Sequence, residues 1–286
     1  MFWILTGLLA AFSSATKDYV SKHTMKNSNH YLTTWALMTL SVPFLLVALF
    51  FVGIPQIGAI FWPVALFSSV LYVISVSLYM KAISMSPLSL TLPMLSFTPI
   101  FMLITGPILL GEFPEPLGIL GIVCIVSGAY VLNIKEARRG ILQPFVSLLK
   151  EKGPVLMLLV SLMWSVFSTL MKNLILESNM ILAVASVYSI SAVMFSIFVI
   201  MTKRFGLKEI RKNFRNLTSI GFFMALSEIS LSYTYTMTLA VYAIAVKRTS
   251  ILMGSIYGFK FFKEGNVTQR LAGSVLMILG IVLIAL

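Results

Sequence analysis

The sequence carries little charge for its length. Of its 286 residues only 10% are charged, whereas 59% are hydrophobic and the mean hydropathy is +0.99. A soluble domain has about 25% charged and 45–50% apolar residues, because a surface that faces water needs many polar side chains. The composition therefore excludes a soluble globular domain and predicts an integral membrane protein.

Cysteine and histidine are also scarce. One cysteine, Cys124, and two histidines, His23 and His30, exclude a disulfide framework and argue against a Cys/His zinc site. The sequence holds no Ser/His/Asp grouping, glycine-rich phosphate loop or paired-carboxylate motif, so we expect no enzyme, cofactor or metal site. The net charge of +12 comes from bases in short segments between apolar stretches, so no nucleic-acid partner is expected.

Apolar residues instead gather in windows long enough to cross a bilayer, which takes about 20 residues in a helix. Continuous runs favour helices over the alternating strands of a membrane barrel. The first window has no basic flank or cleavage site and is interpreted as a retained helix. The stretches 134–153 and 203–216 are basic and are expected to be loops. The ten windows are 2–22, 31–52, 59–80, 87–110, 114–133, 154–176, 181–202, 217–237, 240–262 and 267–286.

The two halves of the chain resemble each other. Phe12-Ser13-Ser14 and Lys17 match Phe167-Ser168-Thr169 and Lys172 at an offset of 155 residues. Glu112, Gly121 and Gly128 match Glu264, Gly273 and Gly280 at an offset of 152. An odd number of spans per repeat inverts the second half, as in transporters that hold a substrate at the midplane. The prediction is an all-α membrane fold of ten transmembrane helices in two inverted five-helix repeats, 1–140 and 154–286, joined by a basic loop, 141–153.

Several segments resemble the drug/metabolite transporter superfamily, specifically its EamA-type permeases. The resemblance implies secondary transport or export of small metabolites such as amino acids, sugar phosphates or nucleotide sugars across the cell (plasma or inner) membrane, without a cofactor. The segments that carry it are the first span ending in Lys17, Trp164-Ser165, Thr98-Pro99-Ile100-Phe101, Leu110-Gly111-Glu112, Lys247-Arg248-Thr249-Ser250-Ile251-Leu252 and Phe261-Phe262-Lys263-Glu264.

Basic residues concentrate in the odd-numbered connections between windows. By the positive-inside rule, connections 1, 3, 5, 7 and 9 are cytoplasmic and both termini lie outside. The family resemblance implies the opposite orientation, with both termini inside.

Charged residues inside a span are costly and mark functional sites. Glu228 lies about 15 Å, and Lys247 about 13 Å, from the turn near Thr238-Leu239, so both are close to the midplane. We expect Glu228 to neutralise Lys247 or Arg248, and an anionic substrate group to compete for that base. The alternative is an ion pair that only joins two helices. Adjacent residues point about 100° apart on a helix, so one base should face the cavity and the other a neighbouring helix.

The Lys247-Arg248 pair is similar to the phosphate-binding pair of plastid sugar-phosphate carriers in the superfamily. Its repeat partners, Leu95 and Ser96, are uncharged, so a carboxylate is as plausible a ligand as a phosphate.

Each of the remaining candidate residues has a possible structural role as well as a functional one. Tyrosines and hydroxyls suit a polar cavity wall or helix packing; they are Tyr79, Ser96, Thr98, Tyr235 and Tyr242. Lysines near span ends suit a gate or snorkelling to the interface, and acids at span ends suit a gate or a helix cap. These candidates are Lys17, Lys172, Glu112 and Glu264. Prolines predict a kinked fourth span opposite a straight ninth span.

The predicted function is a secondary transporter of a small polar metabolite, driven by a gradient, a coupled proton or a counter-solute because no ATP-binding loop is present. Two other readings stay open at this point: a lipid-linked carrier or flippase of the same fold, and a membrane partner protein that transports nothing. The first requires a cavity that opens sideways between spans.

Overall fold

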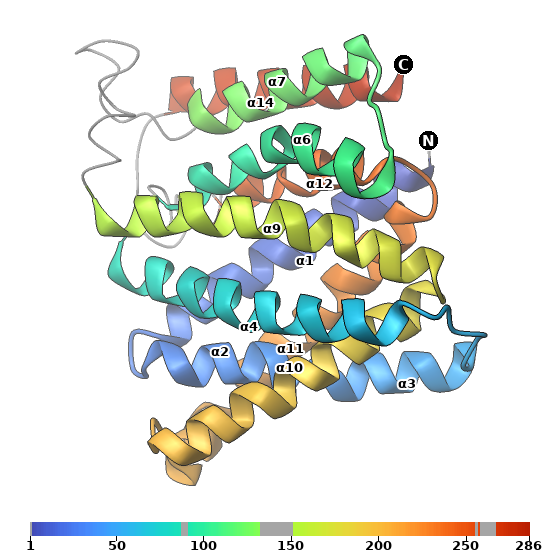
Figure 1. Ribbon diagram of the computed structural model, residues 1–286. Helices are drawn as coiled ribbons and strands as arrows, with labels where there is room; N and C mark the ends of the chain where they lie inside the picture. Colours follow the sequence, from blue (N-terminus) through green and yellow to red (C-terminus); the bar gives the residue numbers. More distant parts are fainter. Residues whose placement is uncertain (1, 87–90, 132–150, 255–256, 258–266) are drawn as a thin grey trace.

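A computed structural model describes residues 2–86, 91–131, 151–254, 257 and 267–286. Within these residues every regular element is a helix, and the helices lie alongside one another with both chain termini at the same end (Figure 1). The first half contains α1 (Phe2–Thr24), α2 (His30–Thr39), α3 (Val42–Val52), α4 (Phe61–Met85), the 3-10 helix η1 (Leu92–Phe97), α6 (Thr98–Leu110) and α7 (Pro116–Val131). The second half contains α9 (Lys152–Leu176), α10 (Met180–Thr202), α11 (Leu207–Tyr235), α12 (Ala240–Lys247) and α14 (Val267–Ala285).

The helices coincide with the predicted windows, but three windows are broken. The second is interrupted between α2 and α3, and the fourth changes from η1 to α6; α3 and α6 each have a proline in the first turn, where no N–H is needed. The ninth was expected to be straight, and that prediction is wrong. Its helix ends at Lys247, and the hydroxyl of Thr249 donates to the Val246 carbonyl at 2.8 Å, competing with the helical hydrogen bonds.

The stretch 203–216 is also not a loop throughout, because α11 begins at Leu207. Ile210 packs against the core and Leu217 is fully buried. Their spacing of seven residues places both on one face of a helix. This periodicity, rather than the density of bases, decided the local structure.

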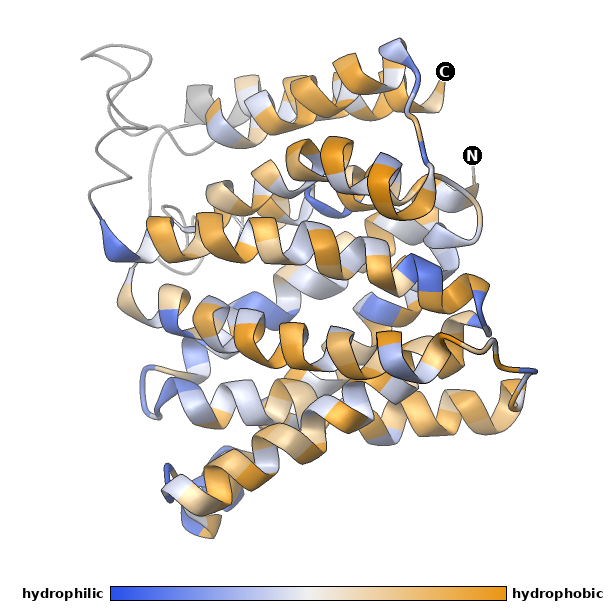
Figure 2. Ribbon diagram, in the orientation of Figure 1, coloured by the Kyte–Doolittle hydropathy of each residue, from blue (hydrophilic) through white to orange (hydrophobic). Residues whose placement is uncertain are grey.

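The outer surface is apolar, as a lipid-facing surface requires. Phe50 and Phe51 on α3 are 84% and 81% exposed, and the hydrophobic colours cover the helices on the outside of the bundle (Figure 2). Among the described residues, four helical runs are long and apolar enough to cross a membrane: His30–Val52, Phe61–Met85, Lys152–Leu176 and Met180–Thr202. Shorter apolar helices comprise Met94–Leu110, Pro116–Val131 and Ala272–Ala285.

The paired glycines bring α7 and α14 into backbone contact. A Cβ at Gly121 would lie 2.7 Å from the Gly280 carbonyl oxygen, and one at Gly128 would lie 2.6 Å from that of Gly273. Side chains at these positions would force the helices apart. These glycines therefore allow the close approach of α7 and α14.

Candidate functional site

A polar cavity of about 50 Å³ lies in the middle of the bundle. This volume accommodates only a few water molecules. Its charged lining comprises Lys17, Asp18, Glu228, Lys247 and Arg248. Its aromatic lining comprises Tyr72, Tyr79, Trp164, Phe167, Tyr188 and Tyr235. The side chains come from both halves of the chain.

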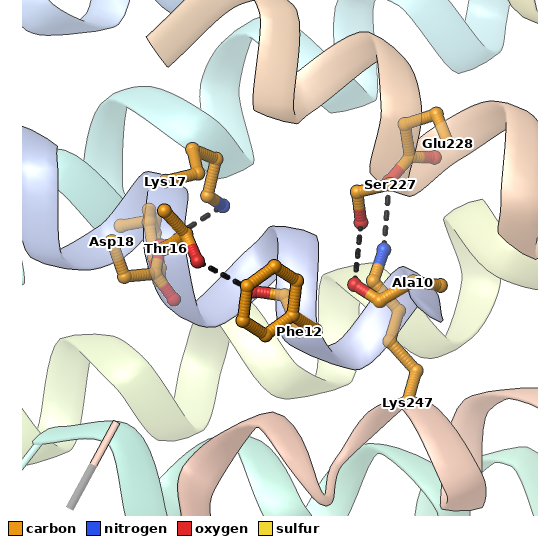
Figure 3. A network of polar contacts seen from close by, with 9 residues as sticks. Ala10, Phe12, Thr16, Lys17, Asp18, Ser227, Glu228 and Lys247 are labelled. Carbon is orange, nitrogen blue, oxygen red and sulfur yellow. Dashed lines mark hydrogen bonds and ion pairs between the residues drawn. The ribbon is translucent and has the colours of Figure 1, made fainter. Parts of the chain in front are cut away.

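Glu228 and Lys247 form an ion pair across the cavity. The Nζ atom of Lys247 on α12 donates to Oε1 of Glu228 on α11 at 2.7 Å (Figure 3). The Lys247 side chain is only 13% exposed, and the Glu228 side chain only 7%. The neighbouring Ser227 hydroxyl donates to the Ala10 carbonyl at 3.0 Å and ties α11 to α1. The predicted pairing of Glu228 with one of the two bases is confirmed, and the base is Lys247.

Arg248 lines the same cavity, so the expectation that only one of the two bases faces it is wrong. The helix ends at Lys247, and the turn that follows does not hold the two side chains at the spacing of a continuous helix. The Arg248 Nη2 atom donates to the Thr98 hydroxyl at 2.8 Å, and the guanidinium lies 5.5 Å from the Trp164 ring centre. Its Nε atom is buried without a hydrogen-bond partner. Within the described residues, no carboxylate forms an ion pair with Arg248.

Lys17 lies in the cavity rather than at a helix end. It is 4% exposed, which excludes snorkelling to the interface, and its Nζ lies 2.9 Å from the Asp18 carboxylate. Asp18 also accepts a hydrogen bond from the Tyr79 hydroxyl. Asp18 was missed by the sequence analysis, although a carboxylate within a predicted span was itself a signal. Lys17 is therefore not a base of the first connection. The other bases still concentrate in the odd-numbered connections.

A second polar cluster lies at one end of the bundle. Lys172 on α9 forms an ion pair with Glu112, and its Nζ also donates to the Thr238 carbonyl at 2.7 Å. The Ala240 amide donates to Oε2 of Glu112 at 2.7 Å. Glu112 therefore caps α12, in the other half of the chain, and not the next helix along the sequence as one alternative had it. We call Glu112, Lys172 and the turn before Ala240 the end latch.

The remaining candidates are divided between the cavity and other places. Tyr79 and Tyr235 line the cavity, and Thr98 reaches it through Arg248. Tyr242 does not, since its hydroxyl accepts a hydrogen bond from the Glu115 amide at 3.1 Å. Ser96 is fully buried outside the cavity lining. Glu264 lies outside the described residues.

Two tyrosines of the cavity escaped the sequence analysis. The hydroxyls of Tyr72 and Tyr188 are buried without a hydrogen-bond partner, and the two rings lie 4.7 Å apart. Their windows are strongly apolar, so a tyrosine there carried no signal that separates a cavity wall from packing. In the described part of the chain, no cluster of three His, Cys, Asp or Glu side chains offers a metal site.

The helical bundle with an apolar exterior and a charged central cavity defines a multi-pass membrane protein with a buried polar site. The model of the EamA-like transporter family matches residues 1–134 and 151–286. The chain therefore belongs to the EamA-like transporter family, a family of membrane transporters of small molecules within the drug/metabolite transporter superfamily.

Comparison with solved structures agrees on the fold. One crystal structure, titled only as that of a protein, superposes with a TM-score of 0.72 at 13% sequence identity, covering 98% of this chain and 95% of that chain. No curated protein matches the chain.

Proposed function

We propose that the chain is a secondary transporter with ten spans in two inverted five-helix repeats, and that it moves a small anionic metabolite by alternating access. The packing of the helices supports the repeat. Helix α1 packs on α11, and α4 packs on α9. Because α9 is the repeat equivalent of α1, and α11 that of α4, these two contacts are equivalent with the halves exchanged. Three further contacts, α2 with α10, α6 with α12 and α7 with α14, join equivalent helices of the two halves.

The directions of the helices support the inversion. In Figure 1, α1 runs from the N-terminal side of the view towards the opposite side, and its repeat equivalent α9 runs the other way. The glycine contacts follow the same symmetry: Gly121 meets Gly280 while Gly128 meets Gly273. An inverted repeat provides two conformations of similar energy that open to opposite sides of the membrane.

The observation that carries the substrate class is the unequal pairing of the three cavity bases. Lys17 and Lys247 each have a carboxylate partner, whereas Arg248 is held by a hydroxyl and an aromatic ring. A buried guanidinium that forms no ion pair within the described residues can bind a carboxylate or phosphate through two parallel hydrogen bonds. The buried Nε of Arg248 has no hydrogen-bond partner and can donate the second of these bonds.

Alternation requires that each end of the cavity can close. The end latch joins α9, α12 and the α6–α7 connection at one end. At the other end, Lys22 donates to the carbonyls of Ile83 and Ser86, where α4 ends. With both ends tied, the small cavity corresponds to an occluded state. We propose that substrate binding at Arg248 is coupled to release of the end latch. We also propose that the protein lies in the plasma or inner membrane, with its odd-numbered connections in the cytoplasm.

Ligand-dependent thermal stabilisation of the detergent-purified protein tests the substrate class. A ligand that binds only the folded state raises its stability by RT ln(1 + [L]/Kd). We expect a carboxylate or phosphate metabolite to stabilise the wild type and Lys81→Ala, whose base is exposed on α4, but not Arg248→Ala. Counterflow of that anion into liposomes should follow the same order.

The outcomes separate the competing functions. Stabilisation by neutral or zwitterionic solutes that persists in Arg248→Ala would assign Arg248 a structural role. Stabilisation by lipid-linked sugars alone would favour a lipid-linked carrier or flippase. Binding without counterflow would favour a membrane partner that transports nothing.

A further inference from the structure

The start of α11 carries a dense basic surface that the central cavity does not use. Residues 203–215 contain six bases and one acid, Glu209. The bases are Lys203, Arg204, Lys208, Arg211, Lys212 and Arg215, and all six are exposed. None of them forms an ion pair with another described residue.

The helix itself does not explain this charge. The N-terminus of a helix carries a partial positive charge, so bases in the first turns are disfavoured. Lys208, Arg211 and Arg215 are spaced three and four residues apart and share one face of α11. The protein therefore concentrates positive charge where its own electrostatics oppose it, which indicates an anionic partner outside the chain.

An apolar groove begins next to these bases. It has a volume of about 480 Å³ and is lined by Phe44 of α3 and by Phe214, Arg215, Thr218, Ser219 and Phe222 of α11. Phe214 is 60% and Phe222 43% exposed, and the Phe222 ring contacts Phe44 edge to face at 5.4 Å. From Phe214 to Phe222 the groove extends about 12 Å along the helix, away from the basic turns.

We infer that this groove and the basic turns form a binding site for one anionic phospholipid. The headgroup phosphate lies between Arg211 and Arg215, and an acyl chain lies along Phe214 and Phe222. Charge complementarity selects this occupant, because clusters of four to eight bases at the end of a membrane helix bind acidic lipids. The apolar groove continues from the bases towards the lipid-facing surface of α3, so headgroup and chain are recognised together. The site does not depend on what the central cavity carries.

Native mass spectrometry of the purified full-length protein tests the site. Phosphatidylglycerol and phosphatidylcholine with identical acyl chains are supplied in equal amounts, and the ratio of bound lipids is measured. We expect phosphatidylglycerol to be retained preferentially, with the preference decreasing as salt is added. Each base near an acidic headgroup contributes about a fivefold factor, so Arg211→Gln with Arg215→Gln should lower the preference about 25-fold.

Matched variants keep the result interpretable. Lys152→Gln removes one exposed base at the same end of the bundle, outside the groove, and should leave the ratio unchanged. Phe222→Ala should weaken retention of phosphatidylglycerol without any change in net charge. All variants should show a cooperative melting transition in detergent without added lipid, which excludes misfolding.

Three results would overturn the inference: equal retention of both lipids, a preference that survives the double arginine variant, or displacement of phosphatidylglycerol by inorganic phosphate alone. The last would identify a site for free anions rather than for a lipid.

Discussion

Arg248 and Thr98 lie 150 residues apart in the chain and meet in the cavity, where the guanidinium donates to the hydroxyl at 2.8 Å. Each residue stands at the interruption of its span: Thr98 begins α6 after η1, and Arg248 follows the end of α12. At the repeat offset of 152, Thr98 corresponds to Ser250, where the chain is helical again. Interrupted helices from opposite halves therefore meet at the base that we assign to the substrate, as the proposed inverted repeat requires.

The hydroxyl of Thr98 positions Arg248. Thr98→Val keeps the shape of the side chain and removes the acceptor, and a hydrogen bond to a charged group contributes about 1.5–3 kcal/mol. We expect the affinity for the stabilising anion to decrease by about tenfold or more, measured from the ligand dependence of the melting temperature. Thr98→Ser, which keeps the hydroxyl, should restore binding, and failure to do so would show that Thr98 only packs.

Glu228 pairs with Lys247 in the interior of the bundle. Glu228→Gln leaves a buried ammonium without its counter-charge, which costs about 3–5 kcal/mol. The melting temperature in detergent should therefore decrease strongly. The double variant Glu228→Gln, Lys247→Met removes both charges and should recover most of the loss. If the single variant is as stable as the wild type, the pair contributes nothing to the fold.

We propose that the end latch closes one end of the cavity. Glu112→Gln removes the charge that holds Lys172 and weakens the cap of α12, so the cavity should open more often at that end. The measurement is the reaction of Ser168→Cys, in the cavity wall, with a small impermeant thiol reagent after Cys124→Ala. We expect faster labelling in Glu112→Gln than in Glu115→Gln, an exposed acid of the same connection. Equal rates would exclude a gating role.

The contact between α7 and α14 tolerates no side chain at its glycines. Gly128→Ala places a Cβ 2.6 Å from the Gly273 carbonyl oxygen, and such overpacking costs about 1–3 kcal/mol. Gly106→Ala is the control, because its Cβ meets only the Glu112 carbonyl oxygen at 3.7 Å and alanine favours a helix. Thermal unfolding should show destabilisation for Gly128→Ala alone.

The charge bias predicts the orientation. In a Cys124→Ala background, Gln56→Cys lies between α3 and α4 and Arg204→Cys between α10 and α11, and both positions are exposed. An impermeant maleimide should label Gln56→Cys in intact cells and Arg204→Cys only after permeabilisation. The reverse pattern would place both termini inside, as the family resemblance implies.

Composition and periodicity by themselves determined the membrane class and the position of most helices. Long apolar runs admit few structures in a bilayer, where every backbone polar group must be paired internally. Hydropathy therefore predicted the helices well, but it missed the breaks in the second and ninth windows. At residues 207–216, four bases masked an apolar face. The pairing of Glu228 with Lys247 was also predictable, because their depths along two successive spans are set by counting residues from one turn.

Only the tertiary structure decided which groups meet across the halves. Asp18, Tyr72 and Tyr188 join the cavity because α1, α4 and α10 turn those faces inward, and a sequence does not specify the rotation of a helix about its axis. Glu112 caps α12 instead of α7 for the same reason, since the amide that it caps, that of Ala240, lies 128 residues away. No proline marks the helix break at Arg248, which arises from local hydrogen bonds of Thr249. Because of this break, the side chains of Lys247 and Arg248 both face the same cavity.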